Sequence, residues 1–422
     1  MVVSDPREAI DAVWRIESPR LIAGLARMMG DVGAAEDLAQ DALVAALETW
    51  PEAGVPDNPG AWLMATAKRR GIDLLRREKL KERKHELVAR ELEDVQEAGV
   101  GELESALDDP IGDDVLRLVF TACHPVLTAE AGAALTLRLV GGLTTGEIAR
   151  AFLVGEATMG QRIVRAKRAL ADARVPFEVP RGAELEKRLP SVLGVIYLIF
   201  NEGYAATAGE DWVRPALCED ALRLGRMVAE LMAGEPEVHG LVGLMEIQAS
   251  RLHARSGPEG EPVLLLDQDR TRWDQLLIRR GLAAIERANA LGAEPGPYLL
   301  QAEIAACHAR AKTAAETDWH RIIAIYDVLL RVQPSPVVAL NRSVAVAMAY
   351  GPEAALPLVD ALASEPALRD YHLLPSVRGD LLAKLGRADE ARLELERAAS
   401  LTLNERERKL LVAKADALAR EG

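Results

Sequence analysis

The chain has 422 residues, of which 49 % are hydrophobic and only 4 % aromatic, and its formal net charge is −14. Abundant alanine and leucine with so few aromatics favour helices and argue against a β-sandwich or barrel, so we expect an all-α fold. At about 100–200 residues per domain, the length predicts roughly two to four domains. The acidic total argues against general nucleic-acid binding, although a local basic patch can still support it.

Cysteine usage and hydropathy indicate a cytoplasmic protein. Cys123, Cys218 and Cys307 lie far apart and form neither a disulfide framework nor a CxxC motif, which is typical of a reducing compartment. The longest apolar run, residues 192–200, is shorter than the about 20 residues that a membrane span needs. The N-terminal residues lack the basic start and apolar core of a signal peptide.

Charge is distributed unevenly along the first half. Residues 61–90 contain ten Lys/Arg and four Asp/Glu, whereas residues 91–114 contain ten Asp/Glu and no Lys or Arg. The acidic stretch also contains Gly99 and Gly101, and we interpret it as a linker. Such a linker is either a solubilising connector or a polyanion that occupies a channel built for nucleic acid.

The segment NPGAWLMATAKRRGIDLLRRE, residues 58–78, predicts an amphipathic helix with Asn58 as its N-cap and Pro59 in its first turn. Cations on one face suit phosphates, and Trp62 beside them suits stacking on an unpaired base. Alternatively, Trp62 belongs to the core and the cations form a solvated face. One stripe is expected to be buried: Leu63, Met64, Ala67, Gly71, Leu74 and Leu75.

The preceding segment, residues 34–50, predicts another amphipathic helix. An acidic patch on an otherwise Ala- and Leu-rich helix can dock a basic partner, although the pattern alone is common. The expected buried stripe consists of Ala35, Leu38, Ala42, Ala46 and Trp50. The expected polar side consists of Glu36, Asp37, Gln40 and Asp41.

Residues 128–173 predict a helix-turn-helix. Thr128 can cap a first helix, and Thr144 and Glu147 form a capping box for a second. After a break at Val154–Gly155, a third helix has an apolar face and an opposite face of polar and Arg side chains, the pattern of a DNA-reading helix. An ordinary helical hairpin is the alternative. The apolar face consists of Met159, Ile163, Ala166 and Leu170.

Together and in this order, the three segments resemble a bacterial extracytoplasmic-function sigma factor of the sigma-seventy family. The resemblance covers residues 7–175 and implies a non-catalytic protein that binds core RNA polymerase and promoter DNA, with no cofactor and no metal. It implies core-polymerase binding by Asp37, Leu38, Gln40 and Asp41. It implies −10 binding by Trp62, Lys68, Arg69, Arg70, Arg76 and Arg77. It implies −35 binding by Thr158, Met159, Gln161, Arg162, Arg165 and Arg168.

The remaining residues predict a helical extension with a repeat signal. In residues 376–400, small and apolar residues fall at tetratricopeptide spacing, and residues 343–362 fit a weaker copy. The whole chain therefore resembles a sigma-factor subgroup with a C-terminal tetratricopeptide-like extension, which implies a built-in regulator with a protein or small-molecule partner. The expected domains are residues 1–86 (region 2), 87–112 (linker), 113–176 (region 4) and 177–422 (extension).

Several polar residues in the extension are candidates for a regulatory site. Helix capping and packing are the alternative roles for all of them. Cys123–His124 suggests a metal, but four zinc ligands at recognisable spacing are not visible near it. The regulatory candidates are Asn201, Glu202, Tyr204, Asp267, Asp269 and Arg270.

A second functional hypothesis uses the same helices differently. The chain would then be a polymerase-independent helix-turn-helix regulator whose helical domain senses a ligand or a peptide. This hypothesis leaves the helices at 34–50 and 58–78 without a role. Nothing in the sequence assembles a nucleophile, a base and an oxyanion site, so we do not expect an enzyme.

Overall fold

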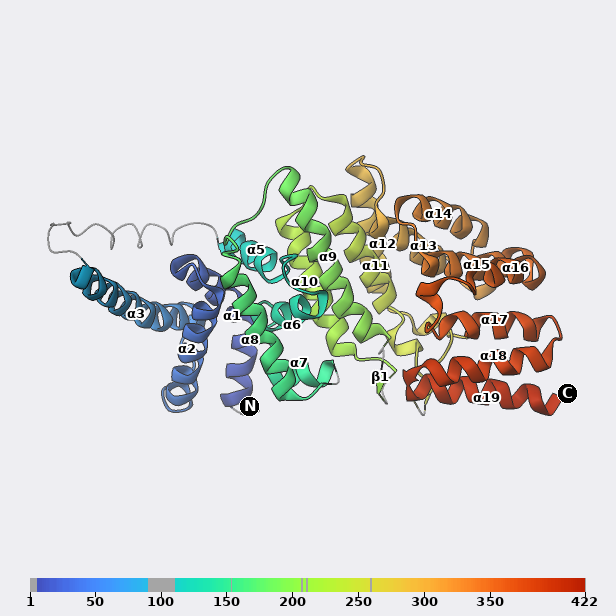
Figure 1. The fold of residues 1–422 in the computed structure, drawn as a ribbon, viewed down its shortest axis with the longest axis horizontal. Coiled ribbons are helices and arrows are strands. Elements are labelled where there is room, and N and C mark those ends of the chain that lie inside the picture. The colour runs from blue at the N-terminus through green and yellow to red at the C-terminus, as the bar shows by residue number, and fades with distance from the viewer. Residues whose placement is uncertain are drawn as a thin grey trace. The chain divides into compact units, whose positions relative to one another are not determined.

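The computed structural model describes residues 6–89, 111–152, 154–205, 208–209, 212–258 and 260–421. Nearly all the described residues with regular structure are helical, and the only strands among them are two short ones, so the all-α prediction is confirmed (Figure 1). Within the described part of the chain, no helix is long and apolar enough to cross a membrane. The chain divides into two compact units, residues 1–198 and 199–422, each described here by itself.

The first unit contains the helices that correspond to the three predicted segments, together with helices before, between and after them. They are α1 (Pro6–Met29), α2 (Val32–Ala53), α3 (Pro59–Ala89), α5 (Ile111–Ala122), α6 (Ala129–Leu139), α7 (Thr145–Ala151), α8 (Glu156–Asp172) and most of α9 (Ala183–Tyr204). Of the expected linker, residues 90–110 lie outside the described part of the chain.

The second unit begins within α9 and is built from successive helices. Its longer helices are α10 (Pro215–Leu231), α11 (Pro236–Ala249), α12 (Gln275–Ala290), α13 (Pro297–Arg310), α14 (Trp319–Val332), α15 (Pro336–Tyr350), α16 (Pro352–Leu362), α17 (Leu373–Lys384), α18 (Ala388–Leu401) and α19 (Glu405–Glu421). Its short elements are β1 (Ala208–Gly209), η1 (Leu252–Ala254), η2 (Arg270–Arg272), η3 (Ala314–Glu316), η4 (Pro366–Leu368) and β2 (Leu403–Asn404). The two strands pair in parallel, with Ala208 opposite Leu403.

Helices α1, α2 and α3 pack together. The Asp31 side chain caps α2 by accepting from the Ala34 N–H at 2.8 Å, and all five residues of the predicted α2 stripe are buried. Gly71 lets α3 approach closely, because a Cβ at this position would lie 2.6 Å from the Met28 Cε. The prediction that Leu74 is buried is wrong, because it is 40 % exposed, and the Leu75 side chain lies outside the described residues.

The helix-turn-helix has the predicted caps. Thr128 accepts from the Ala131 N–H at 3.3 Å, and Glu147 accepts from the Thr144 N–H at 2.7 Å while the Thr144 hydroxyl accepts from the Glu147 N–H at 3.2 Å. Gly155 starts α8 without a side-chain cap. All four residues of the predicted apolar face of α8 are buried, which fixes the face that α8 presents outward.

The early part of α9 packs on the first unit. Arg188 donates to the Phe120 carbonyl at 2.9 Å, and the Ser191 hydroxyl donates to the Cys123 carbonyl at 2.7 Å. The compact first unit therefore includes residues beyond 176. The domain boundary expected at residue 176 stays a prediction. Cys123 itself is buried and 3.3 Å from the Thr136 hydroxyl, and burial raises the pKa of its thiol to about 12. Among the described residues, no group of three or more metal-ligating side chains comes together.

The predicted helical hairpin at residues 376–400 is present as α17 and α18. Gly386 turns the chain between them with φ of 74°, a conformation that favours glycine. Gly379 allows close contact, because a Cβ there would lie 2.9 Å from the Leu395 Cγ. Helices α17, α18 and α19 lie side by side, which gives the last part of this unit a continuous helical layer (Figure 1).

Candidate nucleic-acid interface

Helix α2 presents part of its predicted polar side to solvent. The Asp37 and Asp41 side chains are 79 % and 61 % exposed, and Gln40 is half-buried. Leu38, by contrast, is only 5 % exposed and packs toward α3 near Gly71. Asp37, Gln40 and Asp41 therefore contribute to the outward surface near the start of α2, and Leu38 positions the helix.

The expectation that Glu36 lies on the exposed acidic side is wrong. Glu36 is 3 % exposed, and its carboxylate lies 2.6 Å from the Arg138 Nε and 2.5 Å from the Lys167 Nζ. Gln40 also donates to this carboxylate. Helical periodicity cannot reveal this burial, because the two cations come from α6 and α8. The basic partners of Glu36 are therefore two side chains of the same chain, Arg138 and Lys167.

The electrostatics of Glu36 follow from these neighbours. Burial by itself raises the pKa of the carboxyl group, but the charges and hydrogen bonds of Lys167 and Arg138 outweigh burial and leave the pKa below its ordinary value. Glu36 is thus a carboxylate held in its charged form. A second ion pair of the first unit joins Arg27 of α1 to Asp114 of α5 at 3.3 Å.

The cationic face of α3 is open to solvent where the structure describes it. Arg69 and Arg76 are exposed and Lys68 is half-buried, and none of the three has an ion-pair partner among the described residues. Arg70 is also exposed but lies 3.3 Å from the Asp41 carboxylate and donates to the Asp41 carbonyl at 2.9 Å. The Arg77 side chain lies outside the described residues. The face therefore offers phosphate-binding charge.

Trp62 is partly packed in the core and partly accessible, so it has features of both alternatives, a core residue and a residue that stacks on a base. It is half-buried and meets the ring of the buried Trp50 edge-on, with the ring centroids 5.3 Å apart at 66°. An edge-on aromatic contact is a favourable packing geometry. The packing fixes the position of Trp62 while leaving part of the residue accessible at the start of α3.

Helix α8 presents a polar face of the kind that reads DNA. Thr158, Gln161, Arg165 and Arg168 are exposed, and Arg162 is half-buried. They lie opposite the buried face, so the five side chains form the outward surface of the helix-turn-helix. Met159 is fully buried, so its side chain takes part in the packing of α8 instead of presenting a surface to DNA.

In the second unit, two of the regulatory candidates, Glu202 and Tyr204, are engaged in structural contacts. Glu202 is buried and pairs with Arg214 at 2.5 Å. The Arg255 Cζ lies 3.8 Å from the centroid of the Tyr204 ring, a cation–π contact. These contacts favour the structural alternative for Glu202 and Tyr204.

Two further candidates also hold the fold together. Arg270 donates to the His308 and Ala311 carbonyls at 2.6 and 2.7 Å, and Asp269 caps η2 by accepting from the Thr271 N–H at 2.9 Å. Asn201 is half-buried and Asp267 is exposed. A regulatory role for this set remains a prediction.

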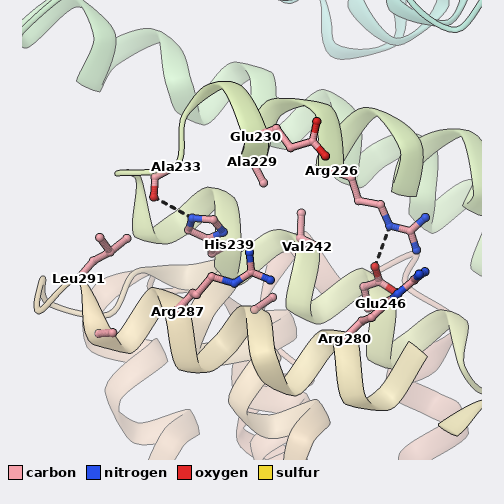
Figure 2. A pocket seen from close by; sticks show the side chains of 12 residues that line it. Arg226, Ala229, Glu230, Ala233, His239, Val242, Glu246, Arg280, Arg287 and Leu291 are labelled. Carbon is pink, nitrogen blue, oxygen red and sulfur yellow. Dashed lines mark hydrogen bonds and ion pairs between the residues drawn. The ribbon is translucent and has the colours of Figure 1, made fainter. Parts of the chain in front are cut away.

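A pocket in the second unit was not predicted from the sequence. It has a volume of about 640 Å³, and its polar side chains come from α10, α11 and α12 (Figure 2). A usable signal was present: His239 and Glu246 are two turns apart on the otherwise largely apolar α11, so they share a face. The polar residues of the pocket are Arg226, Glu230, His239, Glu246, Arg280 and Arg287.

Comparisons with known families match both halves of the chain. Residues 14–81 match the model of sigma-70 region 2, and residues 117–170 match that of sigma-70 region 4. Residues 188–289 match a family of unknown function, DUF6596. The uncharacterized protein R00370 of Rhizobium meliloti (strain 1021) is 44 % identical over 413 residues, which cover 98 % of this chain and 96 % of that protein.

Proposed function

The chain belongs to the sigma-70 family, whose region 2 and region 4 domains indicate a factor that binds RNA polymerase and recognises promoters, and from this premise we propose specific roles for its helices. We propose that it is an extracytoplasmic-function sigma factor. Helix α2 binds core polymerase through Asp37, Gln40 and Asp41, with Leu38 positioning the helix. The cationic face of α3 binds the −10 element, and α8 reads the −35 element.

The observation that carries this proposal is the pair of outward polar faces on α3 and α8. Each face is backed by buried apolar residues, so its cations point away from the core. Phosphate contacts by Lys and Arg supply affinity, and Arg and Gln in a major-groove helix supply base readout. Because the chain is acidic overall, its DNA binding depends on these two cationic faces. We therefore expect tight binding only where both faces contact the same promoter.

The −10 role rests on Trp62, Lys68, Arg69, Arg70, Arg76 and Arg77. The half-buried Trp62 supports stacking on an unpaired base, because Trp50 holds its ring in place. Arg70 pairs with Asp41, so it links α3 to α2 in addition to offering positive charge to a bound DNA strand. Arg69 and Arg76 are the exposed cations without such a pair among the described residues.

Run-off transcription with bacterial core polymerase on a genomic-fragment library tests the proposal. Specific transcripts from the intact protein, lost with Asp37→Arg/Asp41→Arg, are the expected result. Glu48→Arg changes an exposed acid elsewhere on α2 and serves as the matched control, with transcripts retained. Absence of polymerase-dependent transcripts together with tight duplex binding by the protein alone would support the polymerase-independent regulator instead.

The extension is proposed to regulate the promoter-binding helices. Its support is the covalent fusion of a helical unit, whose successive helices pack together as α17 and α18 do, to a promoter-binding unit. The test is a chain that ends at Tyr204. Residues 188–195 of α9 contact the preceding helices of the first unit, and a chain that ends at residue 176 would lack them. Unchanged promoter use, transcript level and response to partners would refute regulation by the extension.

A further inference from the structure

The pocket of the second unit has a floor from α11 and two walls. His239, Val242 and Glu246 recur at helical spacing and form the floor, while α10 and α12 supply the walls (Figure 2). Its volume of about 640 Å³ falls in the range of about 300–1,000 Å³ that is typical of small-molecule sites. The pocket lies almost entirely within residues 188–289, which match a family of unknown function.

Glu246 is the buried polar group of this floor. It is 2 % exposed, and its Oε1 accepts from the Arg226 Nε at 2.8 Å. Its Oε2 is buried and has no hydrogen-bond partner among the residues that the structure describes. A buried acceptor without a donor is costly, so this oxygen is suited to a donor supplied by a bound molecule.

The α12 wall carries two guanidinium groups that form no ion pair within the described part of the chain. Arg280 and Arg287 are exposed and, unlike Arg226, have no ion-pair partner among the described residues. They are two helical turns apart and therefore lie on one face of α12, about 10 Å from each other along the axis. Figure 2 shows Arg226, Glu246 and Arg280 at one end of the pocket, and Arg287 nearer to His239.

Glu230 on α10 is a second carboxylate of the lining and is exposed, and the remaining lining residues are apolar. The apolar lining leaves room beside the charged groups and offers a surface to the non-polar body of a ligand. At the far end from Glu246, Figure 2 shows Leu291 and Ala233, and the Ala233 carbonyl is held by the His239 Nε2 at 2.9 Å. The apolar lining residues are Ala229, Ala233, Val242, Ala284, Ala290 and Leu291.

We propose that this pocket binds a small organic anion, a carboxylate or a phosphate ester, that also carries an amino or hydroxyl group. The anionic group pairs with Arg280 and Arg287, because these are the lining arginines without an ion-pair partner among the described residues. The amino or hydroxyl group donates to the free Oε2 of Glu246. Binding is a property of the extension alone; only an effect of the ligand on transcription rests on the function proposed above.

Isothermal titration of the full-length protein in low salt tests the site with defined probes. L-serine and glycerol 3-phosphate present a carboxylate and a phosphate ester, each with a donor, and glycerol is the uncharged control. A wider set of hydroxy and amino carboxylates and phosphate esters follows the same protocol. Saturable binding of at least one anion, and none of glycerol, is the expected result, and the two probe classes distinguish carboxylate from phosphate.

Variants locate the bound anion. Arg280→Gln and Arg287→Gln should each weaken binding at least tenfold. Arg279→Gln removes an exposed arginine next to Arg280 that does not line the pocket, and it should leave the affinity unchanged. Glu246→Gln should weaken the anions that carry a donor more than propionate, which has none.

Three results would overturn the proposal. The first is no binding by any member of the set, and the second is equal weakening by Arg279→Gln and Arg280→Gln, which indicates non-specific charge attraction. The third is Arg280-dependent binding of an acidic peptide when every small anion fails, which identifies a peptide groove. Because no polymerase is present, these results are independent of whether the protein directs transcription.

Discussion

The carboxylate of Glu36 on α2 lies 2.5 Å from the ammonium group of Lys167 on α8, and it is 3 % exposed. This ion pair joins the helix that is proposed to bind polymerase to the helix that is proposed to read the −35 element. Arg138 of α6 completes the contact from a position 102 residues along the chain. Any separation of α2 from α8 must therefore uncover a buried carboxylate and two cations.

Substitution of Glu36 should weaken the first unit. Glu36→Gln removes the charge and leaves Arg138 and Lys167 facing each other without it, which we expect to lower the free energy of unfolding by about 1–3 kcal/mol. Urea unfolding at pH 7 measures the change. Asp37→Asn, at a carboxylate that is 79 % exposed and 3.8 Å from Lys167, should change stability by less than about 0.5 kcal/mol. Equal effects of the two variants would contradict a buried bridge.

The same bridge predicts a pH dependence. Because the folded pKa of Glu36 lies below its ordinary value, its contribution is present at neutral pH and is lost as the pH falls through that lowered pKa. The stability difference between the parent protein and Glu36→Gln should therefore shrink on acidification below the ordinary carboxyl range. Unfolding curves at several pH values measure it, and a difference that stays constant down to pH 3 would argue against this linkage.

Glu36 also shows what sequence patterns can and cannot predict. The helices predicted at 34–50, 58–78 and 128–173 and two of their caps follow from local spacing, as the Thr128 cap and the Thr144–Glu147 box demonstrate. Burial of Glu36 depends on cations from α6 and α8, which periodicity along α2 does not contain. The pocket was missed for the same reason, since it exists only where α10 and α12 flank α11.

Gly240 should be essential to the helix that forms the pocket floor. A Cβ at Gly240 would lie 2.7 and 2.8 Å from the backbone N and Cα of Leu299, atoms that cannot rotate away. We expect Gly240→Ala to cost at least about 2 kcal/mol of stability through overpacking. Gly234→Ala is the control, because no atom of the described residues lies within 4 Å of its Cβ position, and it should be neutral or slightly stabilising. Thermal unfolding of both variants decides, and similar melting temperatures would refute the close α11–α13 contact.

His308 should make the second unit sensitive to acid. It is 7 % exposed, and burial, reinforced by the positive charges of Arg251 and Arg270, lowers its pKa to about 3. The unfolded chain binds a proton near the ordinary value of 6.5 and the folded chain does not, so stability falls as the pH falls from about 6.5 to about 3. The loss attributable to His308 is on the order of 2–4 kcal/mol over this interval.

A variant without the imidazole tests this assignment. His308→Gln should flatten the dependence of unfolding free energy on pH across that interval, whatever it does to stability at pH 7. His320→Gln removes an exposed imidazole from the neighbouring α14 and controls for the loss of one histidine. The assignment to His308 is refuted when both variants keep the slope of the parent protein.

Arg165 should contribute sequence-dependent promoter affinity. It is exposed on the outward face of α8 and has no ion-pair partner among the described residues, so its guanidinium group is available to a base edge. In the polymerase holoenzyme, Arg165→Gln should cost about 1–3 kcal/mol in promoter binding and relax the preference at one −35 position. Arg181→Gln removes the same charge from an exposed arginine outside the helix-turn-helix and should preserve that preference. Binding to a promoter library measures both, and an equal, sequence-independent loss in the two variants would mean that Arg165 contacts only phosphate or none of the DNA.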